Sequence, residues 1–119
     1  MPPAATPPPS LPLPLSAEAL NTALSAYVAT FPSAARLRAH LEAAGLTAHA
    51  AQFELELKAA VAAAEDFIYA AAGRGKWDAA FNERFFQAVA ARHPWLSRDA
   101  FRSLGSFGQY LNWHDGLGL

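Results

Sequence analysis

The four histidines are the side chains of this chain best suited to bind a metal or move a proton. A di-iron site in a helical bundle needs Glu-x-x-His pairs, and a zinc hydrolase needs His-Glu-x-x-His. Neither spacing occurs, and His40 and His49 lie on either side of a turn. The absence of cysteine also excludes thiolate ligands and disulfides. We therefore expect no metal site.

A catalytic site is also not indicated by the other reactive side chains. His114 and Asp115 could serve as a base and its orienting carboxylate, but adjacent helix residues point about 100° apart, so a polar helix end explains them better. No nucleophile motif surrounds Ser103 or Ser106, and residues 73–75 are too short for a phosphate-binding loop. We expect a protein that is not an enzyme and binds no cofactor.

Charge gives little support to a nucleic-acid or membrane partner. The net charge is −1, with −3 over residues 17–72 and +2 over residues 73–119. No segment approaches the roughly 20 apolar residues of a membrane span, and prolines interrupt every apolar run that could be a signal peptide. We expect a cytoplasmic protein with no membrane association. Its alanine-rich, cysteine-free composition is typical of small helical proteins from GC-rich bacteria.

Residues 1–15 differ in composition from the rest of the chain. The first sixteen residues hold seven of the nine prolines and no aromatic residue. This composition predicts a disordered, extended tail before a single domain over 16–119. The run Pro9-Ser10-Leu11-Pro12 has the PxxP spacing that aromatic grooves bind, although it lacks a flanking basic residue. A plain linker and a short strap packed on the domain are the two other interpretations.

Helical spacing of apolar residues, with no alternating pattern typical of strands, predicts an all-α fold. The fold class is a bundle of about five helices joined by short loops. The predicted helices run from Ser16 to about Thr30, from Ser33 to Gly45, from Thr47 to Gly73, from about Lys76 to His93, and from Ser97 onward.

Two parts of the predicted helices are ambiguous. In the first helix, Phe31 continues the apolar stripe at helical spacing, although Pro32 is expected to stop the helix at about Thr30. In the last, Gly105 and Gly108 predict either a break or a place where another backbone passes closely, since each costs about 1 kcal/mol in a helix interior. We expect residues 113–119 to fray.

The candidate binding residues come from the aromatic C-terminal half, which holds eleven of the fourteen aromatic residues. Tryptophan, tyrosine and arginine dominate interface hot spots. We therefore predict that a partner protein, or a second copy of the chain, binds through Trp95, Arg98, Arg102, Tyr110 and Trp113. The competing interpretation is that Trp95 closes the end of the bundle. Adaptors, inhibitors and toxin-neutralising proteins are the functional types we consider.

Two alternative functions remain open from the sequence. The first is a nucleic-acid-binding regulator with a helix-turn-helix-like element, whose polar face would carry Arg98, Arg102, Ser106, Gln109 and Asn112. The acidic pI of about 6.4 and the two glycines oppose it, so nucleic acid is not the partner we expect. The second is an enzyme or small-ligand binder with a pocket between aromatic helices.

Overall fold

The computed structural model describes residues 15–29 and 31–119, and in this part of the chain the fold is all-α. The elements are α1 (Ala17–Tyr27), α2 (Ala34–Ala43), the 3₁₀ turn η1 (Thr47–His49), α3 (Ala50–Ala71), α4 (Ala79–Arg92) and α5 (Arg98–His114). The predicted five-helix architecture is confirmed. The predicted proline-rich tail lies outside the described residues, except for Leu15, which is buried in the core.

Serine side chains begin three of the helices, as predicted. The hydroxyls of Ser16, Ser33 and Ser97 accept hydrogen bonds from the backbone N–H three residues later, at 3.1, 3.3 and 3.1 Å. Each has the extended backbone of an N-cap. Gly45 follows α2 in the left-handed region, with φ of +71°, and so ends that helix.

Three helix ends differ from the prediction. Thr47 opens η1 and makes no capping bond to α3, which begins at Ala50. The fourth helix begins later than expected, because the Asp78 carboxylate accepts from the N–H of Phe81 at 2.8 Å and caps it there. The first helix ends at Tyr27, because Val28 turns extended and forms an isolated bridge with Pro32.

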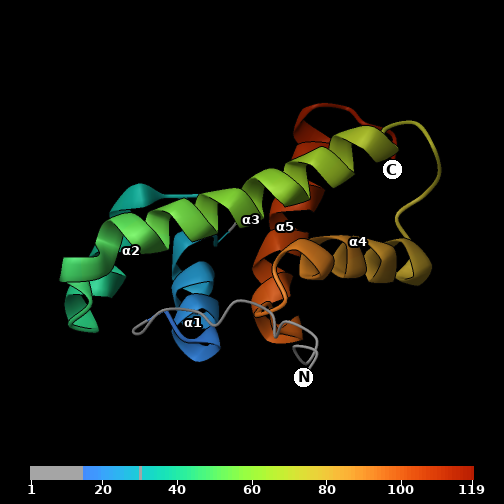
Figure 1. Ribbon diagram of the computed structural model, residues 1–119. Helices are drawn as coiled ribbons and strands as arrows, with labels where there is room; N and C mark the ends of the chain where they lie inside the picture. The colour runs from blue at the N-terminus through green and yellow to red at the C-terminus, as the bar shows by residue number, and fades with distance from the viewer. Residues whose placement is uncertain (1–14, 30) are drawn as a thin grey trace, which may run out of the picture.

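Helix α3 is the central helix of the fold. It crosses the whole structure, and α1, α4 and α5 all contact it (Figure 1). The molecule is only 19 Å thick in its shortest dimension, about two helix diameters. One face of α3 is therefore buried and the other is exposed, with Leu55 on the exposed face at 75% accessibility.

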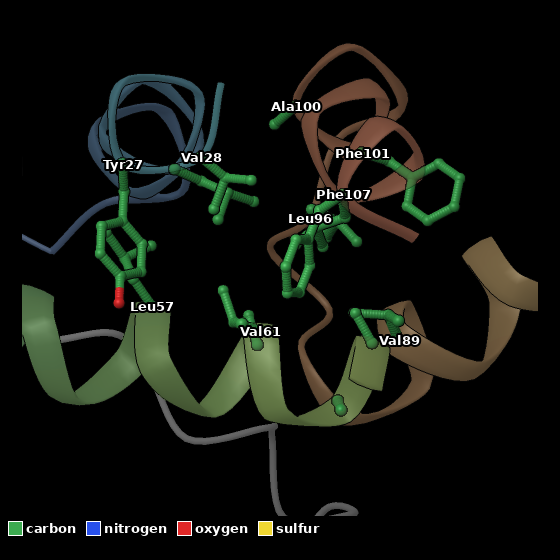
Figure 2. Packing of buried hydrophobic residues seen from close by; sticks show 14 of the residues in the cluster. Tyr27, Val28, Leu57, Val61, Val89, Leu96, Ala100, Phe101 and Phe107 are labelled. Atoms are coloured by element: carbon green, nitrogen blue, oxygen red, sulfur yellow. The ribbon is translucent and has the colours of Figure 1, made fainter. Parts of the chain in front are cut away.

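The core lies where α1, α3 and α5 meet. Figure 2 shows Val28 after α1, Val61 of α3 and Phe107 of α5 pointing into the same space, with Val89 of α4 beside them. The α4 side of the core is aromatic: Phe85 stacks edge-on against Phe101, with ring centroids 4.9 Å apart. The alanines of α3 permit this close helix packing.

Helix α5 is continuous through both glycines, so the predicted break does not occur. A Cβ at Gly108 would lie 2.8 Å from the Trp77 ring and 3.0 Å from the Phe85 ring, so this position must be small for α5 to pack there. Gly105 has no atom within 4 Å of such a Cβ. The close-approach interpretation is correct for Gly108 and does not apply to Gly105.

The C-terminal residues do not fray as expected. Helix α5 extends through Trp113 and His114, and the chain then folds back. The Asn112 side chain donates to Leu119 O and accepts from Leu119 N, both at 2.9 Å. The N–H of Gly73 donates to Leu117 O at 2.8 Å. These bonds tie the C-terminal segment to α5 and to the loop that follows α3.

Candidate functional site

Exposed aromatic side chains from three separate segments gather near the C-terminal end of α5. We call this the aromatic patch: Phe31, Tyr69, Tyr110, Trp113 and His114. The Trp113 side chain is 78% exposed and Phe31 is 52% exposed. Large exposed aromatic groups that cluster in this way are typical of binding surfaces, because leaving them in water is unfavourable.

Four rings of the aromatic patch lie side by side, and Tyr69 joins them through its bond to Asp115. The centroid of Tyr110 lies 6.1 Å from that of Phe31 and 6.3 Å from that of Trp113. On its other side Tyr110 stacks on His114 at 5.2 Å, with 24° between the ring planes. Tyr110 is thus the centre of the patch and is itself half-buried by its neighbours.

Phe31 is held in place by Arg36 on α2. The Arg36 guanidinium donates hydrogen bonds to the carbonyls of Ala26, Tyr27 and Phe31, and it lies 5.6 Å from the centroid of the Phe31 ring. Arg36 thus bonds to the Phe31 carbonyl and lies beside the Phe31 ring, which is exposed. An ordered aromatic side chain loses less conformational entropy when it binds than a mobile one does.

Exposed polar bonds at the patch join the residue that caps α5 to α3. The Tyr69 hydroxyl donates to one oxygen of Asp115, and His114 Nδ1 lies 2.8 Å from the other. The hydrogen bond to Asp115 raises the pKa of Tyr69, and the hydrogen bonds from Tyr69 and His114 lower the pKa of Asp115. Both Asp115 oxygens are thus occupied by structural contacts.

A second surface feature lies between α4 and α5 and ends one helical turn before Trp113. This α4–α5 groove has a volume of about 500 Å³. It is lined by Trp77, Asn82, Phe86, Arg98, Phe101, Arg102, Gly105, Ser106 and Gln109. The predicted residues Arg98 and Arg102 therefore lie together, but on the groove and not on the aromatic patch.

Arg98 is already paired within the chain. Its guanidinium makes two 2.8 Å hydrogen bonds to the Glu83 carboxylate and stacks over the Phe86 ring at 4.4 Å. The hydrogen bonds from Arg98 lower the pKa of Glu83 to about 2, and Glu83 raises the pKa of Arg98. A phosphate or carboxylate ligand would have to compete with Glu83 for this arginine.

Trp95 is separated from the other predicted binding residues. Its side chain is in the core, with 8% of its surface exposed, and its indole N–H donates to Glu56 at 2.8 Å. The Asn21 side chain fixes the same turn, since it donates to Trp95 O at 2.7 Å and accepts from the N–H of Ser97 at 2.8 Å. The structure places Trp95 as the closure of the bundle end.

Of the patch residues, Tyr110 and Trp113 were predicted to bind a partner, whereas Phe31, Tyr69 and His114 were not. The proline after Phe31 is a signal that the helix ends there and that Phe31 lies in a turn. Tyr69 lies beside the buried stripe of α3, next to Ile68, which predicts an exposed position. His114 was recognised, but as part of a helix end.

The residues of the nucleic-acid alternative are divided between two roles. Ser106 and Gln109 line the α4–α5 groove with Arg102. The Asn112 amide is used by its two bonds to Leu119 and is not available to read a base edge. Together with the pairing of Arg98, this means that two of the five side chains of the polar face are used within the chain.

Comparisons with protein-family models, curated proteins and solved structures found no match to this chain. Within residues 15–29 and 31–119, no group of three or more histidine and acidic residues could hold a metal ion. None of the helices in those residues combines the length and the apolar character that crossing a bilayer requires.

Proposed function

We propose that this protein is a non-enzymatic interaction module that binds another protein through the aromatic patch. The observation that carries the proposal is the exposure of Trp113 at 78% on α5, with its ring 6.3 Å from that of Tyr110, which in turn lies 6.1 Å from the ring of Phe31 in a distant turn. Covering these rings would remove a large apolar area from water at little entropic cost. Tryptophan and tyrosine at the centre of such a surface are typical hot spots.

We also propose a cellular location and a functional type for the protein. We place it in the bacterial cytoplasm, an assignment based on composition alone. Adaptor, inhibitor and toxin-neutralising roles all use a small helical domain with one binding surface. Arg36 and His114 at the patch would suit a partner surface that carries hydrogen-bond acceptors beside an apolar centre.

The test uses a photo-crosslinking residue in place of Trp113 in living cells of the source organism, followed by identification of the crosslinked protein. The affinity of the purified pair is then measured for the wild-type protein, Trp113→Ala and Leu55→Ala. Leu55 is the matched control, because it is a large exposed apolar residue that lies about 21 Å along α3 from Tyr69. We expect Trp113→Ala to weaken binding about 30-fold or more, and Leu55→Ala to leave it unchanged.

Stability measurements keep this test interpretable. Trp113→Ala is expected to change the free energy of unfolding by less than about 0.5 kcal/mol, because the side chain is exposed. Equal losses of affinity in both variants, or unchanged affinity in Trp113→Ala, would exclude the patch as the binding site. Sedimentation of the protein alone tests for self-association. A dimer that Trp113→Ala dissociates would show that the patch binds a second copy of the chain.

A further inference from the structure

The α4–α5 groove has an aromatic lining and an open side. Trp77, Phe86 and Phe101 line it, and the rings of Phe86 and Phe101 meet edge to face with centroids 5.3 Å apart. Trp77 and Phe86 are half-buried, so part of each side chain remains accessible. A Cβ at Gly105 would meet no atom within 4 Å, so the α5 side of the groove is open there. The volume of about 500 Å³ lies within the range of roughly 300–1,000 Å³ that is typical of small-molecule sites.

The groove also has one positive charge without a counter-ion. Its charged lining residues are Arg98 and Arg102, and no acidic residue lines it. Arg98 is neutralised by its two 2.8 Å hydrogen bonds to Glu83. Arg102 is exposed and forms no ion pair within residues 15–29 and 31–119. The charge that a ligand in the groove would meet is therefore that of Arg102.

Further hydrogen-bond donors lie beside Arg102 on the same face of α5. Ser106 follows it by one helical turn and Gln109 by two, and both are exposed and line the groove. A guanidinium binds a carboxylate with two parallel N–H bonds, and a hydroxyl one turn away can donate to the same oxygens. Gln109 lies about 10 Å from Arg102 along the helix axis, so the donors extend along the groove.

We propose that the α4–α5 groove binds a small aromatic carboxylate, with the carboxylate on Arg102 and Ser106 and the aromatic ring on the lining beside Gly105. Aromatic rings of a ligand pack favourably on those of Trp77 and Phe86. One arginine without a counter-ion balances the single charge of a carboxylate. A phosphate monoester carries about −1.5 to −2 charges at pH 7 and would be only partly balanced. The charge of Arg102 repels a cationic ligand.

The test uses naphthoate as the probe, because it carries one carboxylate on an aromatic ring system. It is titrated into the isotope-labelled full chain, and binding is followed by the NMR chemical shifts of the backbone amides. We expect saturable shifts of the amides of Asn82, Ser106 and Gln109, and no shift of the amides around Leu55, which lies outside the groove.

Two probes with the same rings and different charges test the role of the carboxylate. Naphthamide is uncharged, and naphthylmethylamine is a cation. We expect naphthamide to bind about 10-fold or more weakly than naphthoate, because it forms no charge-assisted hydrogen bond with Arg102. We expect naphthylmethylamine to leave the amides of the groove unshifted.

Two arginine variants test the proposed anchor. Arg102→Gln is expected to weaken naphthoate binding about 10-fold or more and to remove the preference for naphthoate over naphthamide. Arg92→Gln is the matched control, because Arg92 is an exposed arginine that lies 3.6 Å from Asp66 and does not line the groove. It is expected to leave naphthoate binding unchanged.

Two variants of Gly105 test the place of the ring. Gly105→Leu puts a large side chain on the open side of the groove, where its Cβ meets no neighbour, whereas Gly105→Ala leaves most of the space free. We expect naphthoate binding to be lost in Gly105→Leu and kept in Gly105→Ala. Melting temperatures and the spectra of the free proteins show whether both variants are folded.

Several outcomes would overturn the proposal. These are the absence of saturable shifts at millimolar naphthoate, equal binding of naphthoate and naphthamide, and unchanged naphthoate binding in Arg102→Gln. Shifts centred on Trp113 would place the ligand on the aromatic patch. Tighter binding of adenosine monophosphate than of naphthoate would make a phosphate the preferred anion. Because Trp113→Ala is expected to leave naphthoate binding unchanged, this test is independent of whether the aromatic patch binds a partner protein.

Discussion

The indole Nε1 of Trp95 donates a 2.8 Å hydrogen bond to Glu56 Oε1, across 39 residues of sequence. The same carboxylate oxygen lies 3.0 Å from His93 Nδ1. Glu56 is on α3, and the other two residues form the turn between α4 and α5. This contact fixes the turn that sets the direction of α5 and hence the position of both the aromatic patch and the groove.

Trp95→Phe is expected to lower the free energy of unfolding by about 1.5–3 kcal/mol. The change keeps an aromatic ring but removes the N–H that bonds to a carboxylate, a type of hydrogen bond worth about that much. Urea unfolding followed by circular dichroism measures the loss. Trp113→Phe is the control and is expected to change the value by less than about 0.5 kcal/mol. Similar losses in both variants would contradict a structural role specific to Trp95.

Acid is expected to destabilise the protein partly through Glu56. Burial alone would raise the pKa of Glu56, but hydrogen bonds from Trp95 and His93 outweigh it and hold the pKa below its ordinary value. Since the unfolded-state pKa is higher, at about 4.3, this stabilisation is present above that pH and is lost as the pH falls through the folded-state pKa. We expect the free energy of unfolding of Glu56→Gln to fall less steeply below about pH 5 than that of the wild type.

The variant Glu83→Gln separates the contribution of Glu56 to acid destabilisation from that of the exposed ion pair between Glu83 and Arg98. The pKa of Glu83, lowered to about 2 by Arg98, also makes the protein lose stability in acid, but the pair is exposed and therefore screened by salt. Unfolding from pH 7 to pH 3 at low and high salt distinguishes the two. If Glu56→Gln follows the wild-type curve at both salt concentrations, Glu56 does not contribute.

The two glycines of α5 are expected to respond to alanine in opposite directions. Gly105→Ala should stabilise the protein by about 0.5–1 kcal/mol, because it improves helix propensity and meets no neighbour. Gly108→Ala should destabilise it by about 1–3 kcal/mol, because the new methyl would lie 2.8 Å from the Trp77 ring. Chemical denaturation of the two variants measures the sign of each change in the free energy of unfolding. An increase in stability for Gly108→Ala would show that the Trp77 ring moves away at little cost.

Asn112→Ala is expected to release the C-terminal segment while the bundle stays folded. The amide hydrogens of Leu119 and Gly73 should exchange faster with deuterium, since the clamp on Leu119 and the bond from Gly73 to Leu117 hold them. Global stability should fall by about 1 kcal/mol or less. Asn82→Ala, on the exposed groove rim, should leave both exchange rates unchanged. Slow exchange in Asn112→Ala would mean that packing of Leu117 and Leu119 alone holds the segment.

The helices were predictable because their signals are local. Ser16, Ser33 and Ser97 mark helix starts by bonding to groups three residues away, and Gly45 marks an end by its own backbone freedom. Two helix ends were misplaced although their signals are also local, because the bridge between Val28 and Pro32 shortened α1 and Asp78 caps α4. The close approach of Gly108 to Trp77 depends on a distant residue, and the sequence left it open.

The residues of the candidate site were likewise predictable only in part. The types of Tyr110 and Trp113 and their positions one turn apart were evident in the sequence, and both belong to the aromatic patch. Trp95 has the same type but lies in the core, because Glu56 on α3 provides a partner for its N–H. Phe31 also belongs to the patch, and Arg36 on α2 bonds to its carbonyl and lies beside its ring.

The sequence by itself determined the all-α class, the approximate helices and the enrichment of aromatic residues in the C-terminal half, since composition and short-range spacing control these properties. Only the tertiary structure decided which aromatic side chains are exposed and which arginine is already paired. Burial and pairing depend on residues that are distant in sequence, such as Glu56 for Trp95 and Glu83 for Arg98. Their proximity is set by the packing of whole helices against α3.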